Sequence, residues 1–264
     1  MKHIVMYSGG IGSFMTVKRV MEKENSKDII LLFTDTLTED EDLYRFIEET
    51  KEHLGVTFVR LCDGRDVWEV FKDIKYLGNS RIAPCSRVLK QEPARKWIEE
   101  NYQPEEVTLY IGIDWTESQR LIKVKKNWLP YKIVAPLCEE PYITKDEMIN
   151  QLEKLGIKKP RLYDLGFSHN NCGGFCVRAG QAHFANLLEH MPDRYKYHEE
   201  KELEIASYLK KDVTILRRQR NKKIEPLTLK KFRSEIESKE TNYDLFDFGG
   251  CACFIEESKS EYIA

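Results

Sequence analysis

The chain has 264 residues, and 41% of them are hydrophobic, so it can bury the core of one large domain or of one domain with an appendage. Charged residues make up 33% of the chain, but acidic and basic side chains nearly cancel, leaving a formal net charge of -2. This balance excludes a strong overall field for a polyanionic partner, so any contact with nucleic acid must be local.

The composition also bears on the compartment. No apolar run approaches the ~18 residues that a membrane helix needs, and the opening residues, MKHIVMYSGG, are not typical of a secretory signal. The seven cysteines are an odd number, which fits reduced thiols, metal ligation or catalysis better than a secreted disulfide framework. These features predict a cytoplasmic protein without a membrane segment.

Short apolar strands alternate with amphipathic helices through the first half of the chain. The first strand is expected at His3–Tyr7, and a glycine-rich turn leads from it into a helix over Ile11–Glu24. Further apolar strands are expected at Ile29–Thr34, Val56–Cys62, Val107–Asp114 and Lys132–Leu137. Continuous hydrophobic strands joined by crossover helices indicate a parallel sheet that is covered on both faces. We therefore predict a doubly wound, mostly parallel α/β domain over residues 1–140.

Residues 141–264 differ in character from the first part. A capped helix is expected in TKDEMINQLEKLG, and the glycine- and cysteine-rich segment GFSHNNCGGFCVRAG follows it. Long charged helices are expected between about Gln181 and Glu237, and the last segment, YDLFDFGGCACFIEE, is again apolar and rich in glycine. We predict a helical, cysteine-containing C-terminal region that packs on the sheet.

The loop from Ser8 to Ser13 joins the first strand to the first helix. In a doubly wound sheet such a loop offers backbone amides at a helix N-terminus to a ligand at the carboxyl ends of the strands. Its glycines allow close approach to an oxyanion, and Ser8 and Ser13 can donate hydroxyl hydrogen bonds. The loop therefore predicts a phosphate site, although a tight strand-to-helix turn would use the same glycines. The absence of a Gly-Lys pair excludes a Walker A loop, and SGGIGSF does not fit G-x-G-x-x-G.

Four segments in order resemble the PP-loop (adenine nucleotide α-hydrolase-like) superfamily, and within it the phosphoadenosine phosphosulfate (PAPS) reductase family. SGGIGSF resembles the SGGxDS pyrophosphate loop, with Gly12 at the usual aspartate, and LLFTDTLTEDEDLYRFIEE resembles the segment whose strand ends in Asp-Thr. CSRVLKQEP resembles the family's C-x4-K-x2-P spacing, and GIDWTESQR resembles its block of glycine, serine and arginine on the substrate side. The resemblance covers roughly the first half of the chain.

The resemblance and the residue chemistry together indicate which side chains form the site. The residues expected to bind an adenine nucleotide are Ser8, Gly9, Gly10, Ile11, Gly12, Ser13, Phe14, Asp35, Thr36 and Gly112. The residues expected to act in catalysis are Ser8, Ser13, Lys90, Arg120 and Cys85. Strand-end carboxylates such as Asp35 suit a ribose hydroxyl or Mg²⁺, whereas Lys and Arg suit phosphate or transition-state charge. A thiolate at Cys85, beside arginines, suits sulfur chemistry, with plain packing as the alternative.

Two glycine-flanked cysteine pairs form a candidate metal site. Cys172 and Cys176 lie in HNNCGGFCVRAG, and Cys251 and Cys253 lie in GGCACF. Four thiolates suit either tetrahedral Zn²⁺ or a [4Fe-4S] cluster, and buried cysteines that only pack are the alternative. The Cys-Cys pair that holds a cluster in some relatives is absent, since Ser86 follows Cys85.

The resemblance implies an enzyme that cleaves ATP between its α- and β-phosphates with Mg²⁺ and adenylylates an acceptor, which sulfur or nitrogen then displaces. Three alternatives stay open: a PAPS-type sulfonucleotide reductase, an enzyme that adds sulfur to nucleic acid, and a nucleotide-binding sensor without turnover. The replacement of the loop aspartate by Gly12 motivates the last of these. The basic run LRRQRNKK, Leu216–Lys223, is either a nucleic-acid contact or a solvated face.

Overall fold

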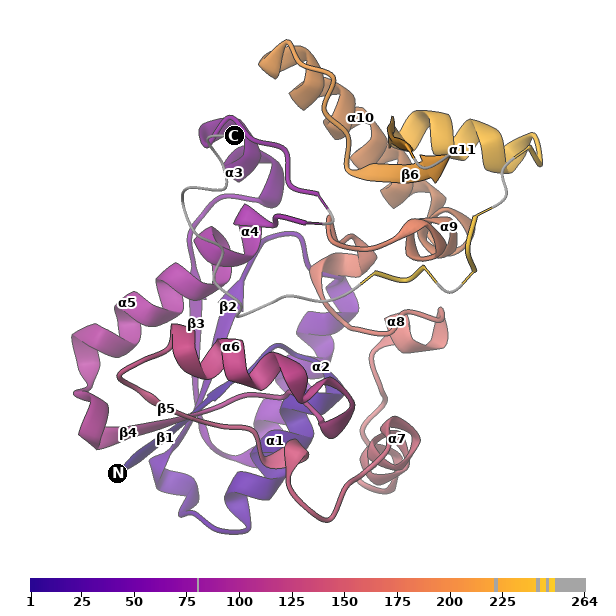
Figure 1. The fold of residues 1–264 in the computed structure, drawn as a ribbon. Coiled ribbons are helices and arrows are strands. Elements are labelled where there is room, and N and C mark those ends of the chain that lie inside the picture. The colour runs from indigo at the N-terminus through magenta and orange to yellow at the C-terminus, as the bar shows by residue number, and fades with distance from the viewer. Residues whose placement is uncertain (80, 221–222, 241–242, 246, 250–264) are drawn as a thin grey trace.

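The computed structural model of the protein describes residues 1–79, 81–220, 223–240, 243–245 and 247–249. Five parallel strands form one sheet in the order β3-β2-β1-β4-β5 (Figure 1). Their bounds are β1 (Lys2–Met6), β2 (Ile29–Asp35), β3 (Thr57–Cys62), β4 (Val107–Tyr110) and β5 (Lys132–Val134). The register places His3 of β1 opposite Ile29 of β2 and Thr108 of β4. The strand order therefore reverses beside β1, which in parallel α/β sheets opens a ligand crevice at the carboxyl ends of the strands.

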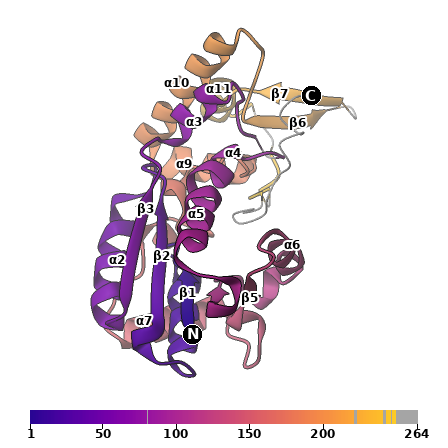
Figure 2. The same cartoon turned by 90° about the vertical axis from the view of Figure 1, so that its left-hand side faces the viewer.

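Helices cover both faces of this sheet, as predicted. Helices α1 (Ile11–Met21), α2 (Glu41–Leu54) and α7 (Lys145–Lys154) pack on one face, and α5 (Glu92–Asn101) and α6 (Gln119–Asn127) on the other. Successive strand residues point to opposite faces, so Val5 joins the first core and Ile4 the second. Figure 2 shows the sheet between α2 and α5. The doubly wound α/β prediction is confirmed.

A second, mostly helical part lies beyond the carboxyl edge of the sheet (Figure 1). It contains α3 (Val67–Asp73), α4 (Pro84–Ser86), α8 (Arg161–Asp164), α9 (Gln181–His190), α10 (Pro192–Leu209) and α11 (Leu229–Glu237). A π-helical segment (Arg87–Gln91) continues α4, and short 3-10 turns occupy Ser26–Asp28, Pro104–Glu106, Trp115–Glu117, Pro136–Cys138 and Cys172–Gly174. Trp68 and Phe71 of α3 pack with Phe175 and Phe184 in one buried aromatic core. The predicted helical C-terminal region with cysteines is confirmed.

The segment between α10 and α11 corrects one expectation. Residues Leu216–Arg220 (β6) and Lys223–Leu227 (β7) pair as antiparallel strands, so the prediction of long helices throughout Gln181–Glu237 is wrong here. Buried Leu216 lies opposite buried Leu227, which anchors one end of the hairpin. Pro226 also lacks the backbone donor that a helix interior requires.

The helix boundaries follow local capping chemistry. Asp40 caps α2, and Gly55 ends it in the left-handed conformation that suits glycine. Thr144 and Glu147 form a reciprocal capping box at the start of α7. This helix buries Met148 in the core shared by α1 and β1, although it follows residue 140. The division into 1–140 and 141–264 stays a prediction.

Candidate functional site

The loop Ser8–Ser13 leads from β1 into α1 at the point where the strand order reverses. Gly9 has a φ of 71°, and its carbonyl accepts a hydrogen bond of 2.9 Å from the Asn170 side chain. The Ser13 hydroxyl donates to the Gly10 carbonyl at 2.8 Å. Gly10 has no side chain to cap α1, and the Ile11 amide donates to the Tyr163 hydroxyl at 3.3 Å, while the positive end of the helix dipole faces the loop. This geometry suits an anion.

Two glycines allow the end of β4 to touch the loop. A Cβ atom built on Gly12 would lie 3.1 Å from the Gly112 carbonyl oxygen, and one built on Gly112 would lie 2.9 Å from the Ser13 amide nitrogen. Both contacts involve backbone atoms, which cannot rotate away as a side chain can. The pair therefore fixes how close the loop lies to the strand beside it. This close approach gives Gly112, predicted as a nucleotide contact, a physical role.

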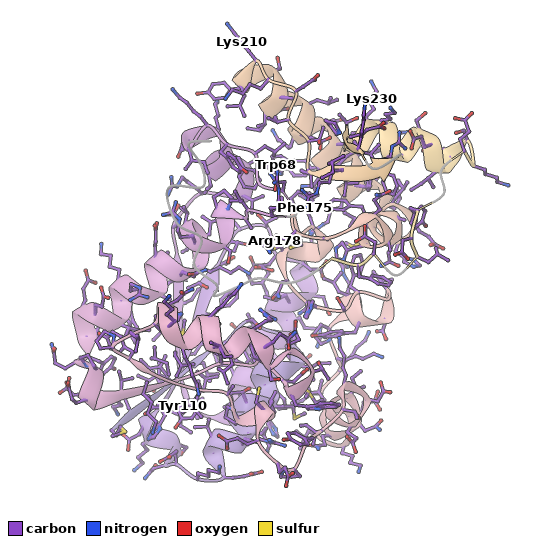
Figure 3. The ribbon with its side chains drawn as sticks, viewed as in Figure 1. Trp68, Tyr110, Phe175, Arg178, Lys210 and Lys230 are labelled. Carbon is purple, nitrogen blue, oxygen red and sulfur yellow. The ribbon has the colours of Figure 1, made fainter. Side chains whose placement is uncertain are left out.

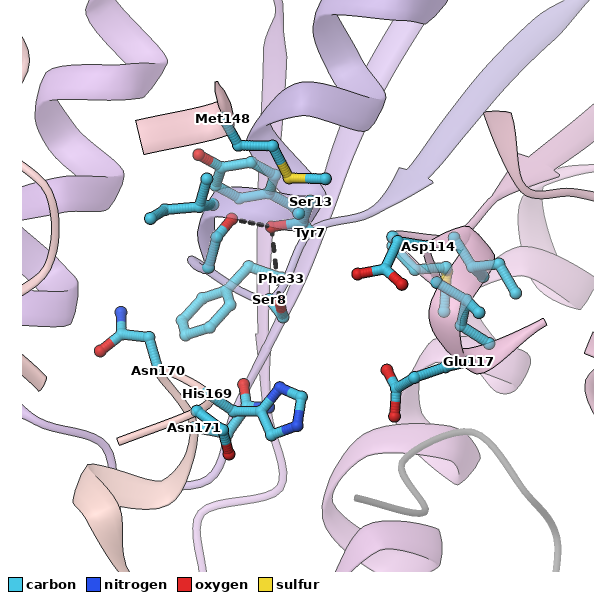
Figure 4. A pocket seen from close by; sticks show the side chains of 18 of the residues that line it. Tyr7, Ser8, Ser13, Phe33, Asp114, Glu117, Met148, His169, Asn170 and Asn171 are labelled. Carbon is cyan, nitrogen blue, oxygen red and sulfur yellow. Dashed lines mark hydrogen bonds between the residues drawn. The ribbon is translucent and has the colours of Figure 1, made fainter. Parts of the chain in front are cut away.

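A pocket opens beside this loop. Figure 4 shows Ser8 and Ser13 between two groups of polar side chains, with Asp114 and Glu117 on one side and His169, Asn170 and Asn171 on the other. The other residues lining it are Met6, Tyr7, Gly10, Ile11, Gly12, Leu32, Phe33, Thr34, Lys90, Ile111, Gly112, Ile113, Arg120, Lys145, Met148, Tyr163 and Ser168. The loop, the ends of β2 and β4, and the segment after α7 thus meet in one site.

Three cationic side chains line the pocket. Lys90 lies 3.4 Å from the buried Glu39 carboxylate, and Arg120 lies 2.7 Å from Glu117. Lys145 lies over the Tyr163 ring at 4.5 Å, and burial lowers the pKa of its ammonium group despite nearby carboxylates. These charges can neutralise phosphate oxygens, and carboxylates already hold two of them in place.

Four of the residues predicted to bind nucleotide, Gly9, Phe14, Asp35 and Thr36, do not line this pocket. Phe14 is fully buried and packs against Phe46 at 6.3 Å between ring centroids. Asp35 is also fully buried and accepts hydrogen bonds from the Leu37 amide and the Tyr44 hydroxyl, both 2.9 Å, and from Arg60. Thr36 donates to Glu39 at 3.0 Å and lines a neighbouring pocket. Phe14 is therefore a core residue. The hydrogen bonds of Asp35 and Thr36 stabilise the end of β2 and the turn that follows it.

That neighbouring pocket is lined by cysteines. Cys85, Cys172 and Cys176 share it with Lys90, whose ammonium nitrogen lies 3.8 Å from the Cys172 sulfur. Lys90 lines both pockets and so connects them. Residues 251 and 253, the other predicted metal ligands, lie outside the described residues. Within the described ranges no three His, Cys, Asp or Glu side chains are arranged to hold a metal ion, so the four-cysteine site stays a prediction.

Sequence reasoning missed the contribution of residues 145–171 to the pocket. Lys145, Tyr163 and Asn170 all lie beyond residue 140, and Tyr163 also accepts a hydrogen bond of 3.3 Å from the Ile11 amide. The available signal was the polar run SHNN before the cysteine pair, because buried polar residues require partners. No helix in the described part of the chain is long and apolar enough to cross a bilayer.

The chain is similar in sequence to a curated protein. Over 171 residues the chain is 30% identical to an uncharacterized protein of Methanocaldococcus jannaschii, covering 64% of this chain and 35% of that protein. The chain thus spans about a third of this curated relative.

Two solved structures are similar at low sequence identity. PAPS reductase from Candida auris, in a phosphate complex, is 15% identical with a TM-score of 0.45, covering 64% of this chain and 80% of that chain. The U34-tRNA thiolase NcsA from Methanococcus maripaludis, with its [4Fe-4S] cluster, is 15% identical with a TM-score of 0.46, covering 80% of this chain and 71% of that chain. Residues 2–172 match the phosphoadenosine phosphosulfate reductase domain. Because this match covers more than half of the chain, the protein belongs to the PAPS reductase family of the PP-loop superfamily.

Proposed function

We propose that this protein binds ATP with its triphosphate on the Ser8–Ser13 loop and transfers the adenylyl group to an acceptor. In this reaction an acceptor oxygen attacks the α-phosphorus, the bond from the α-phosphorus to the bridging oxygen breaks, and pyrophosphate leaves. The observation that carries the proposal is the start of α1, held beside Gly112 and surrounded by Lys90, Arg120 and Lys145. Positioning and charge neutralisation are the main contributions of a protein to such a transfer.

Mg²⁺ fits the carboxylates of this pocket. Asp114 and Glu117 line the side of the pocket opposite Asn170, and Mg²⁺ is usually held by one or two carboxylates together with substrate phosphates. The ion supplies further neutralisation of the phosphate charge when it is bound. Glu117 already pairs with Arg120, and the Thr116 amide and hydroxyl both donate to Oδ1 of Asp114, so the Oδ2 atom of Asp114 is the oxygen that a cation would use.

The cysteine pocket favours sulfur as the group that displaces the adenylate. Cys85, Cys172 and Cys176 lie on the far side of Lys90 from the loop, so a sulfur atom held there would be next to the nucleotide. Sulfur transfer fits this arrangement, and a sulfonucleotide reductase that attacks its substrate through Cys85 is the second candidate. Both place a cysteine sulfur against the same nucleotide.

The test separates these chemistries by their products. The purified protein is incubated with ATP, Mg²⁺ and candidate acceptors, RNA and DNA among them, and separately with PAPS and a thiol reductant, while pyrophosphate, orthophosphate and sulfite are measured. Pyrophosphate from ATP supports the proposal, and sulfite from PAPS supports the reductase. Tight nucleotide binding without either product supports a sensor and contradicts the proposal.

Matched variants then locate the site. The double variant Ser8→Ala with Ser13→Ala removes two hydroxyls that face the loop, and we expect it to weaken ATP binding at least tenfold, or about 1.4 kcal/mol. Ser26→Ala changes an exposed serine at the opposite edge of the sheet and serves as the control. Equal ATP affinity in calorimetry for all three proteins would show that the loop does not hold the nucleotide.

A further inference from the structure

Tyr163 lies against the nucleotide loop at the point where α1 begins. Its hydroxyl oxygen accepts a hydrogen bond of 3.3 Å from the amide of Ile11, the first residue of the helix. A Cβ atom built on Gly10 would lie 3.2 Å from the same oxygen, so the glycine lets the hydroxyl reach the loop. Tyr163 also lines the nucleotide pocket. Its hydroxyl is therefore part of the surface that a ligand on the loop would meet.

The hydrogen bonds of this hydroxyl are all of one kind. A phenol hydroxyl has one proton to donate and lone pairs that accept. The oxygen of Tyr163 accepts from the backbone amides of Ile11 and Asn170. In the part of the chain that the structure describes, no group accepts the proton of Tyr163 in return. The proton is therefore available to an acceptor in the nucleotide pocket.

The surroundings of Tyr163 keep this proton in place. Burial raises the pKa of Tyr163 from 10.0 to about 12, although the two amide hydrogen bonds act in the opposite direction. The Lys145 ammonium nitrogen lies 4.5 Å from the centroid of the ring. A cation over the face of an aromatic ring draws on its π electrons, which makes the hydroxyl a stronger donor. A neutral donor beside a cation suits an oxyanion, because neither group repels negative charge.

Helix α2 holds both Tyr163 and the loop. Tyr163 belongs to α8, in which Arg161 forms an ion pair of 2.8 Å with the buried Asp40 that caps α2. On the other side, a Cβ atom built on Gly9 would lie 2.9 Å from the Leu43 side chain of α2, so the loop packs directly on this helix. The hydroxyl and the loop thus share one frame. A donor that is already held in position loses little freedom when a ligand binds.

We infer that the Tyr163 hydroxyl donates a hydrogen bond to a phosphate oxygen on the Ser8–Ser13 loop and so selects for a nucleotide that carries a phosphate chain. This inference rests on the proposed function, which places the phosphate chain on this loop. A purely structural Tyr163 would instead only occupy the Ile11 amide and compete with the phosphate for it. The two roles change phosphate affinity in opposite directions when the hydroxyl is removed.

The first test compares the binding of inorganic pyrophosphate and of ATP to the wild type and to Tyr163→Phe by calorimetry. Phenylalanine keeps the ring beneath Lys145 and deletes only the hydroxyl. Hydrogen bonds to charged groups are the stronger ones, so we expect both ligands to lose at least tenfold in affinity. Unchanged or tighter pyrophosphate binding, or a loss confined to ATP, would overturn the inference.

The matched control is Tyr195→Phe. The Tyr195 hydroxyl donates to the Leu229 carbonyl at 2.8 Å in the aromatic core around Trp68 and Phe175, which Figure 3 shows in the helical part. This variant removes one buried hydrogen bond outside the nucleotide pocket, so it should unfold more easily in urea yet bind pyrophosphate like the wild type. An equal loss of pyrophosphate affinity in both variants would show that the effect at Tyr163 is only structural.

A second test separates a donor from an acceptor by its sign. 3-Fluorotyrosine in place of Tyr163 has a more acidic hydroxyl, which donates more strongly and accepts more weakly. The raised pKa of Tyr163 keeps the proton on the fluorinated ring at neutral pH. We expect pyrophosphate to bind more tightly to the fluorinated protein. Weaker or unchanged binding would mean that the hydroxyl serves only as an acceptor for the loop amides, which overturns the inference.

Failure of this inference and failure of the proposed function give different results. A wild type that binds neither pyrophosphate nor ATP refutes the proposed function and this inference with it. Wild-type binding that Tyr163→Phe leaves intact refutes only the role of Tyr163.

Discussion

Replacing Gly112 by alanine tests the idea that close backbone contact shapes the nucleotide site. The new Cβ would lie 2.9 Å from the Ser13 nitrogen and 3.1 Å from both the Gly12 carbonyl carbon and the Ser13 Cα. Favourable contacts between carbon atoms lie at about 3.5 to 4.0 Å, so loop and strand must separate by about half an ångström. Overpacking of this kind costs about 1 to 3 kcal/mol of unfolding free energy. We also expect at least a tenfold loss of ATP affinity, or about 1.4 kcal/mol, because the loop amides are displaced.

The control for this variant is Gly55→Ala at the end of α2. Gly55 has a φ of 61° and open space around it, so alanine there costs about 1 to 2 kcal/mol through backbone strain while the loop is untouched. Urea unfolding and calorimetry with ATP are measured on both variants. Comparable stability losses with ATP affinity lost only at position 112 are expected. A folded Gly112→Ala protein that binds ATP like the wild type would refute the reasoning.

Three further predictions concern the clamp on the loop, the cysteines and a buried acid. Asn170→Asp removes the amide that donates to the Gly9 carbonyl. We expect the free energy of unfolding in urea to fall by about 1 to 3 kcal/mol and ATP binding to weaken. Unchanged stability and unchanged ATP affinity would show that Asn170 does not hold the loop in place. After anaerobic purification, we expect metal analysis to find either iron with sulfide or zinc. The variant Cys172→Ser should lose this metal, whereas Cys62→Ser, at an exposed cysteine outside the cysteine pocket, should keep it. Equal metal content in the two variants would exclude Cys172 as a ligand. Burial raises the pKa of Glu202 to about 7 from 4.5, so folding binds a proton in this range and stability falls as pH rises from about 4.5 to 7, by an amount of the order of 3 kcal/mol. Glu202→Gln should flatten that fall in unfolding curves, and a pH dependence identical to the wild type would contradict the assignment.

The sheet could be read from the sequence because most positions of its strands are apolar. A strand buried on both faces, such as Ile29–Asp35, leaves little choice except a parallel sheet covered by helices. The β1–loop–α1 unit was predictable for a related reason, since glycines between a buried strand and an amphipathic helix have few other conformations. The hairpin was missed because its charged residues fit helical and strand periods equally well.

The role of each polar residue in the site depends on contacts between segments that are distant in the sequence. Asp35 ends a strand, as predicted, yet Arg60 and Tyr44 already surround its carboxylate. Asn170 reaches the loop from more than a hundred residues away, and Lys90 lies between the nucleotide and cysteine pockets. Local pattern carries no information about which side chain fills a hydrogen-bonding position across the fold.

The sequence by itself determined the layered α/β fold and the position of the glycine-rich loop between β1 and α1, because these follow from burial periodicity and from the glycines after a buried strand. The resemblance of four ordered motifs indicated the family. Tertiary structure alone decided that Lys145, Tyr163 and Asn170 complete the pocket and that Arg217 and Arg218 face opposite ways. The physical reason is that burial acts on each segment separately, whereas a site is made where segments meet. Their relative placement is fixed by packing of the whole core.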